Sequence, residues 1–171
     1  WTLWASRRCV IPKATQSIHR VRLLAATIGL PENPPTPRLW TRERDDARAE
    51  KFIPDGPPVL ALAPAANWRG KQWDIRKFSQ LAGRLTAKDG ILPAARIAVF
   101  AAALERAQTE ELFRAFPEKR IIDLVGKTDL TEVAACLQRC DFFVGNDSGL
   151  AHMAVATGTP TLSLFGPSRP E

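Results

Sequence analysis

The feature that most limits the folds open to this sequence is a regular alternation of short apolar runs and helical patterns between residues 59 and 165. The run Val59–Ala63 is continuously apolar over the length of a strand, whereas apolar residues recur every three or four positions across Phe78–Leu85. Continuously apolar strands that alternate with helices are typical of a parallel sheet. We therefore expect an α/β fold whose sheet is covered by helices on both faces.

The same pattern gives bounds for the individual elements. Strands are expected at residues 59–63, 96–100, 121–124, 142–144 and 161–165. Helices are expected at residues 74–85, 105–116, 129–137 and 148–157. Asp129 followed by Glu132 resembles a capping box, and Asp89-Gly90 should stop the helix that contains Leu85.

Residues 1–58 have a different character. Seven of the 14 prolines fall in residues 31–58, and proline interrupts regular elements, so this stretch is predicted to be a linker with a short helix at 42–51. A helical pattern at 18–28, closed by Gly29, precedes it. One helix and a linker bury too little apolar surface to fold alone. We expect two parts: residues 1–58, and a domain at residues 59–171.

Composition narrows the functional classes. The chain is 45% apolar and 25% charged, which indicates a globular protein, and its apolar stretches are too short for a transmembrane helix. The net charge of +6 is a small excess of basic residues without interleaved aromatic residues, so we expect a solvated face and no nucleic-acid partner.

Cys136 and Cys140 are expected in the core rather than on a metal, and three scattered cysteines favour a reduced, cytoplasmic protein. The chain lacks an initiator Met and a recognisable signal peptide, as a piece of a longer chain would.

Ligands of parallel sheets bind where strands end, and the fourth expected strand is followed by a polar turn and a helix start. Asp147, Ser148 and His152 share the mouth of this turn, and a helix start favours an anion through its free N–H groups. Gly149 would let a ligand approach the backbone closely. Alternatively, Asp147 or Ser148 simply caps the helix and His152 is a surface residue.

Three other strand ends carry candidates. Lys71 follows the first strand, where a phosphate-binding lysine belongs, although most lysines are simply exposed. Glu105 follows the second and either binds ribose hydroxyls or is simply a first-turn glutamate that the helix dipole favours. The segment 126–129, after the third strand, could border a base. Trp68 and Trp73 are expected to be packing residues. No GxGxxG, Walker or HExxH motif is present, so dehydrogenase, kinase and zinc-protease classes lack support.

Taken in order, these segments resemble glycosyltransferase family 9, the heptosyltransferases of lipopolysaccharide core synthesis. The likeness spans about residues 59–171 and is weaker over residues 1–58. The segments that carry it are Asn67–Trp73, Gly126–Leu130, Asn146–Gly149 with His152, and Phe165–Pro167. The resemblance implies a GT-B architecture of two Rossmann-like domains, with residues 59–171 as the C-terminal, donor-binding one and residues 1–58 as the end of the acceptor domain plus a linker.

The resemblance also implies roles. Lys71 and Asn67 would approach the donor diphosphate together with Ser148 and Gly149. The other implied contacts are Glu105 with the ribose, Thr128 with the adenine, and Asp147 and His152 with the transferred sugar and phosphate. The implied reaction is inverting, uses an ADP-sugar donor and a lipid-linked saccharide acceptor, and needs no metal or other cofactor. Its general base would lie in the N-terminal domain, most of which this chain lacks.

The sequence departs from the family pattern at Ala65, at Ala101-Ala102 and at Asp74, and the added methyl groups could narrow the donor pocket. We expect a cytoplasmic protein, with peripheral contact at the inner membrane as an option, that is not competent for catalysis alone. The alternative is a nucleotide-binding module without transferase activity. The sugar, the linkage and the oligomeric state are not predicted.

Overall fold

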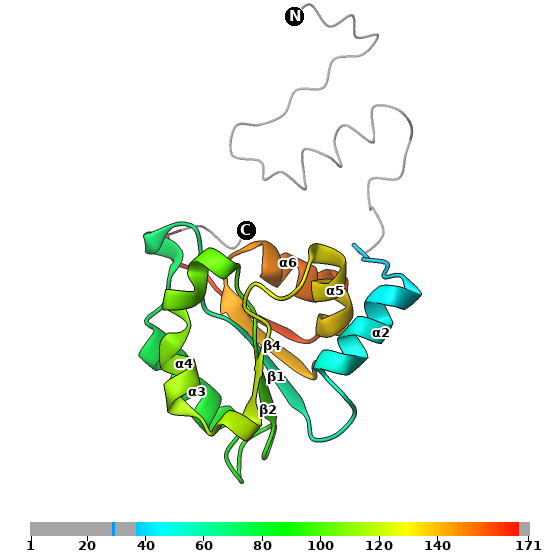
Figure 1. Ribbon diagram of the computed structural model, residues 1–171. Helices are drawn as coiled ribbons and strands as arrows, with labels where there is room; N and C mark the ends of the chain where they lie inside the picture. The colour runs from blue at the N-terminus through cyan, green and yellow to red at the C-terminus, as the bar shows by residue number, and fades with distance from the viewer. Residues whose placement is uncertain (1–28, 30–36, 168–171) are drawn as a thin grey trace, which may run out of the picture. The chain divides into compact units, whose positions relative to one another are not determined.

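The computed structural model describes residue 29 and residues 37–167, and the latter belong to one compact unit (Figure 1). The helix expected at 18–28 lies outside the described residues, although Gly29 itself has a left-handed φ of 80°. Within the described part of the chain, no helix is both long and apolar enough to cross a membrane.

Five parallel strands form the sheet in the order β3-β2-β1-β4-β5. Their bounds are Val59–Ala63 for β1, Arg96–Val99 for β2, Ile121–Asp123 for β3, Phe142–Asn146 for β4 and Thr161–Leu164 for β5. Each lies within two residues of its expected bounds, so the sequence prediction is confirmed. The chain builds outward from β1 to β3 and then returns to add β4 on the other side of β1. This reversal between β1 and β4 is the place where such sheets open a crevice for ligands.

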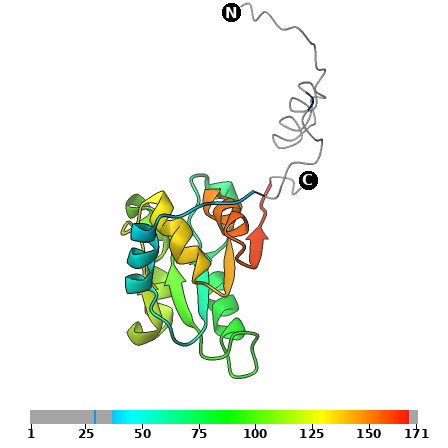
Figure 2. The same cartoon turned by 90° about the vertical axis from the view of Figure 1, so that its right-hand side faces the viewer.

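Helices cover both faces of the sheet, as Figures 1 and 2 show. Leu60 and Leu62 of β1 point to the face covered by α3 (Ile75–Leu85) and α4 (Glu110–Ala115). Alternate β1 residues point to the other face, which is covered by α2 (Glu43–Phe52), α5 (Leu130–Gln138) and α6 (Gly149–Ala156). All five β1 side chains are buried, because a central strand between two helical layers has no solvent face.

One stop signal and one helix differ from the prediction. The helix α3 ends at Leu85, as its expected range does, so Asp89-Gly90 lies beyond the end of the helix and does not stop it. The helix expected at 105–116 is split into a 3₁₀ segment, η2 (Ala103–Gln108), and α4. Thr109 lies between them with its hydroxyl on the Arg106 carbonyl, and such local bonds compete with a continuous helix.

The helix predicted inside the linker exists as α2, and it packs with the sheet. Ala49 and Ile53 are fully buried in the same core as α5 and α6. The compact unit therefore begins at Pro37, and the expected boundary at residue 58 lies inside it. The reason is the apolar stripe of α2, which the proline count of this segment does not reveal.

Candidate functional site

A pocket of about 690 Å³ lies at the carboxyl ends of β1 to β4. This volume is within the range of small-molecule sites. Five predicted residues line it: Asn67, Glu105, Thr128, Ser148 and Gly149. Its remaining lining is mostly apolar and comes from Ala65, Ala66, Phe100, Ala101, Ala102, Ala103, Gly126, Asp129, Leu130, Val133, Leu150 and Met153. The methyl groups of Ala65, Ala101 and Ala102 therefore line this space without closing it.

The start of α6 faces this pocket. Ser148 occupies the N-cap position, yet its side chain makes no capping bond. Its Oγ is buried and has no hydrogen-bond partner within the described residues, which is a costly state for a hydroxyl. The space next to the Gly149 Cα is open: apart from its own helix and chain neighbours, no atom of the described residues lies within 4 Å of a Cβ placed there. The helix start thus offers a hydroxyl, backbone N–H groups and room for an anionic group.

Lys71 and Asp147 meet beside the pocket. Lys71 ends the 3₁₀ segment η1 (Arg69–Lys71), and its Nζ donates to Asp147 Oδ2 at 2.5 Å. The two side chains are 31% and 13% exposed. The contact confirms that the turn after β4 and the lysine loop after β1 lie side by side at one edge of the sheet. Neither residue is among those that line the pocket of about 690 Å³. His152, which is exposed on α6, does not line that pocket either.

Asn146 organises this edge, a role that the sequence analysis did not identify. Its Nδ2 donates to the Pro64 carbonyl at 2.6 Å, and its Oδ1 accepts the Trp73 N–H at 3.1 Å. The side chain is fully buried and so ties the end of β4 to the segments on either side of Lys71. A signal was available, because an amide next to a buried apolar run must find partners.

Gly145 is part of β4, although we expected the turn to begin there. It pairs with Ala63 on one side and Ser163 on the other. A Cβ at this position would lie 2.7 Å from the Phe143 ring, so close packing explains the glycine. The turn therefore begins later, at Asp147.

Ion pairs hold the wall of the pocket that η2 and the loop after β3 form. Asp123 at the end of β3 accepts two bonds from the Arg106 guanidinium, at 2.8 and 2.7 Å, and one from Lys127 at 2.8 Å. Burial alone would raise the pKa of Asp123, but the bonds from Arg106 and Lys127 outweigh burial and lower the pKa to about 2. Lys127 is thus ion-paired, although its side chain is 48% exposed. The cluster joins η2, which carries Glu105, to the loop that carries Thr128.

Glu105 lies in the first turn of η2, as one of the two sequence interpretations has it, and it also caps that turn. Its Oε2 accepts the Ala102 N–H at 2.8 Å. Because a carboxylate can accept about four hydrogen bonds, this contact does not exclude a ligand in the pocket that Glu105 lines.

The cysteines and tryptophans have mainly packing roles. Cys136 and Cys140 are buried in the core, and burial raises the pKa of the Cys136 thiol to about 12 and that of Cys140 as well. No cluster of three potential metal ligands occurs among the described residues. Trp73 packs edge-on against Phe78 with ring centroids 5.3 Å apart, as expected. Trp68 is 56% exposed, and its ring lies against Gly70, so it packs on one face only.

A doubly wound parallel sheet with a pocket at its reversal point defines a Rossmann-like ligand-binding domain. The family model of glycosyltransferase family 9 (heptosyltransferase) matches residues 2–171, and the chain belongs to this family. The expected fold, the C-terminal half of a GT-B architecture, is confirmed.

Individual relatives agree with this assignment. The chain is 32% identical over 118 residues to lipooligosaccharide heptosyltransferase 2 of Haemophilus influenzae, covering 67% of this chain and 33% of that protein. It is 25% identical to the lipopolysaccharide core heptosyltransferase OpsX of the same organism, over 98% of this chain and 47% of the relative. The structure of Escherichia coli ADP-heptose lps heptosyltransferase II matches with a TM-score of 0.69 and 25% identity, over 82% of this chain and 43% of that one. The chain thus spans between a third and a half of these proteins.

Proposed function

We propose that this chain is the donor-binding part of a heptosyltransferase and that its pocket holds an ADP-sugar. The observation that carries the proposal is the start of α6, where Ser148 and Gly149 line the pocket of about 690 Å³, with open space at Gly149 and a buried Ser148 Oγ that has no partner among the described residues. The diphosphate would lie at this helix start, with Asn67 nearby. The nucleoside would extend along Glu105 and Thr128, over the apolar lining.

In the proposed reaction, an acceptor hydroxyl displaces the diphosphate at the anomeric carbon with inversion. Negative charge grows on the leaving diphosphate, and fixed N–H groups and a lysine stabilise such charge. Lys71 is positioned for this role, since Asp147 holds it at the pocket's edge. Asp147 and His152 would approach the transferred sugar. In this proposal, Lys71 and the N-terminus of α6 face the negative diphosphate in place of a divalent metal. The general base would come from a part of the protein that this chain does not supply.

The wider biological role is proposed from the family. The acceptor would be a lipid-linked saccharide of the lipopolysaccharide core, which places the reaction at the cytoplasmic face of the inner membrane. A binding module that lacks transferase activity would show the same nucleotide affinity, so binding tests the site and a transfer assay tests catalysis.

Calorimetric titration with ADP, with and without EDTA, tests the site. We expect binding in both conditions. Gly149→Leu should lower the affinity at least tenfold by filling the open space at the helix start. Gly83→Leu is the matched control, because Gly83 also lies in a helix with no atom within 4 Å of the position that a Cβ would take, yet it is not part of the pocket lining. Binding that disappears in EDTA, or that survives Gly149→Leu unchanged, would contradict the proposal.

A further inference from the structure

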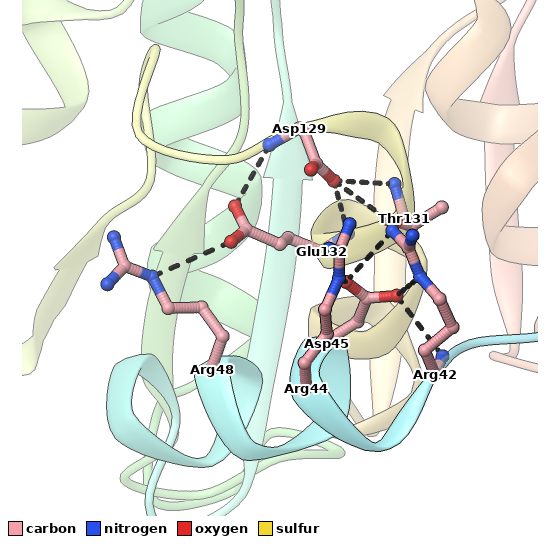
Figure 3. Close-up of polar contacts among 7 residues, drawn as sticks. All are labelled: Arg42, Arg44, Asp45, Arg48, Asp129, Thr131 and Glu132. Atoms are coloured by element: carbon pink, nitrogen blue, oxygen red, sulfur yellow. Dashed lines mark hydrogen bonds and ion pairs between the residues drawn. The ribbon is translucent and has the colours of Figure 1, made fainter.

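A polar network joins α2 to the first turn of α5, as Figure 3 shows. We call it the α2–α5 clamp. It consists of Arg42, Asp45 and Arg48 from α2 and its N-cap, and of Asp129, Thr131 and Glu132 from the start of α5. The two groups are more than 80 residues apart in the sequence. The clamp is therefore a tertiary feature, and neither helix alone explains it.

One arm of the clamp runs through Arg42. Asp45 is 2% exposed, and its carboxylate accepts the Arg42 backbone N–H at 3.1 Å and the Arg42 Nε at 2.9 Å. These bonds fix the guanidinium, whose Nη2 donates to Thr131 Oγ1 at 3.0 Å. The hydrogen bond from Arg42 lowers the pKa of Asp45, so this carboxylate stays charged at neutral pH.

The other arm runs through Arg48, which pairs with Glu132 at 3.7 Å. The Oε2 of Glu132 accepts the Asp129 N–H at 3.0 Å. Asp129 Oδ1 in turn accepts the N–H groups of Thr131 and Glu132 and the Thr131 hydroxyl, each at 2.9 Å. Both arms therefore end on the capping box that begins α5.

The capped turn is also a wall of the pocket. Asp129, Leu130 and Val133 line it, directly after Thr128. Val133 is buried in the core and anchors α5 one turn later, but Leu130 is 74% exposed, so apolar burial does not fix the first residues of the helix. The polar contacts of the capping box and of the clamp therefore fix the position of the first turn of α5.

We infer that Arg42 and Arg48 are positioning residues, which hold the α5 wall of the pocket in the arrangement that receives the nucleoside. They do so through Thr131 and Glu132, without touching the ligand. The inference rests on the proposed function, in which the diphosphate lies at α6 and the nucleoside lies along Thr128 and α5. Loss of the clamp should therefore affect the nucleoside end of the ligand and spare the diphosphate end.

The experiment compares two probes, ADP and inorganic pyrophosphate, by calorimetric titration of the full chain. The double variant Arg42→Ala/Arg48→Ala should bind ADP about three- to thirtyfold more weakly and bind pyrophosphate as before. Arg44→Ala is the matched control, because Arg44 contacts Asp45 at 3.4 Å, and no contact with α5 is found for it among the described residues. It should leave both affinities unchanged. Thr131→Val, which preserves shape but removes the hydroxyl, should reproduce part of the ADP effect.

The outcomes separate the two proposals. If the unaltered chain binds neither probe, the proposed function fails and the inference falls with it. If the unaltered chain binds ADP and both altered chains bind it equally well, the positioning role is wrong and the proposed function stands. An equal loss for ADP and pyrophosphate would indicate general destabilisation and would also overturn the inference. Circular dichroism verifies that each variant is folded, and Thr131→Val decides the matter if the double variant is not.

Discussion

The inner and outer parts of the carboxyl edge are held together by different chemistry. Between β1 and β4, a neutral and fully buried amide, Asn146, bonds two backbone groups. Between β2 and β3, a carboxylate, Asp123, bonds two partly exposed cations, Arg106 and Lys127. The two Asn146 bonds should therefore respond little to pH and salt, whereas the bonds to Asp123, like the Lys71–Asp147 pair at the pocket's rim, should respond to both. The difference also separates the two ends of the proposed ligand, since α6 belongs to the inner edge and Glu105 and Thr128 to the outer one.

The largest expected effect on stability is at Asn146. Asn146→Ala removes both hydrogen bonds and leaves the Pro64 carbonyl and the Trp73 N–H without their partner. We expect a loss of about 2–4 kcal/mol in the free energy of unfolding. Denaturant unfolding measures it, with Asn67→Ala as the control, because Asn67 is exposed and should change stability by less than about 0.5 kcal/mol. Equal effects of the two substitutions would mean that the Asn146 bonds do not hold the inner edge together.

The next effect concerns the ligand at the inner edge. Lys71→Ala should weaken ADP binding by roughly ten- to a hundredfold, equivalent to about 1.5–3 kcal/mol for a charge-assisted hydrogen bond. Lys77→Ala, an exposed lysine on α3, is the control and should have no effect. Titration calorimetry at fixed ionic strength measures both. A Lys71 variant that binds like the parent would remove Lys71 from the site.

The contribution of the outer edge to the free energy of unfolding should depend on pH in the acid range. Because the pKa of Asp123 is depressed in the folded chain, its contribution is present above the unfolded pKa and is lost as the pH falls toward about 2. Asp123→Asn should cost about 2 kcal/mol at pH 7, and this difference should shrink between about pH 4 and pH 2. Urea unfolding of both proteins across this pH range measures it. A cost that does not vary with pH would show that the charge of Asp123 does not contribute to the free energy of unfolding.

The smallest effect is expected at Lys127, whose side chain is 48% exposed. Lys127→Ala should cost less than about 1 kcal/mol, and most of that cost should vanish in about 1 M salt. Unfolding of the two proteins in low and high salt provides the comparison. A larger, salt-independent cost would mean that Lys127 stabilises the fold by packing rather than by charge.

Periodic patterns predicted most of the fold and one part of the site. The strands follow from their continuous apolar runs, and the start of α5 follows from the capping box at Asp129. The meeting of Lys71 with Asp147 could be predicted because both follow strands of a parallel sheet, and strand ends of such a sheet share an edge.

Contacts between distant side chains could not be predicted in this way. Nothing local to Asn146 indicates that it bonds residues 73 and 82 positions away. The pairing of Arg106 with Asp123 depends on the order of β2 and β3, and the α2–α5 clamp depends on where α2 packs. For a charged residue, the sequence specifies the charge but not the partner.

The central claim is that ligand binds at the carboxyl edge, at the start of α6. A second pocket of about 230 Å³ lies at the opposite edge, beside Arg96 and Arg139, and serves as an internal control. Hydrogen exchange with and without ADP, followed by mass spectrometry, tests the claim directly. We predict slower exchange in residues 126–130 and 148–152 and no change in residues 53–59 and 138–141. Slower exchange confined to the opposite edge, or no change anywhere at saturating ADP, would contradict the account.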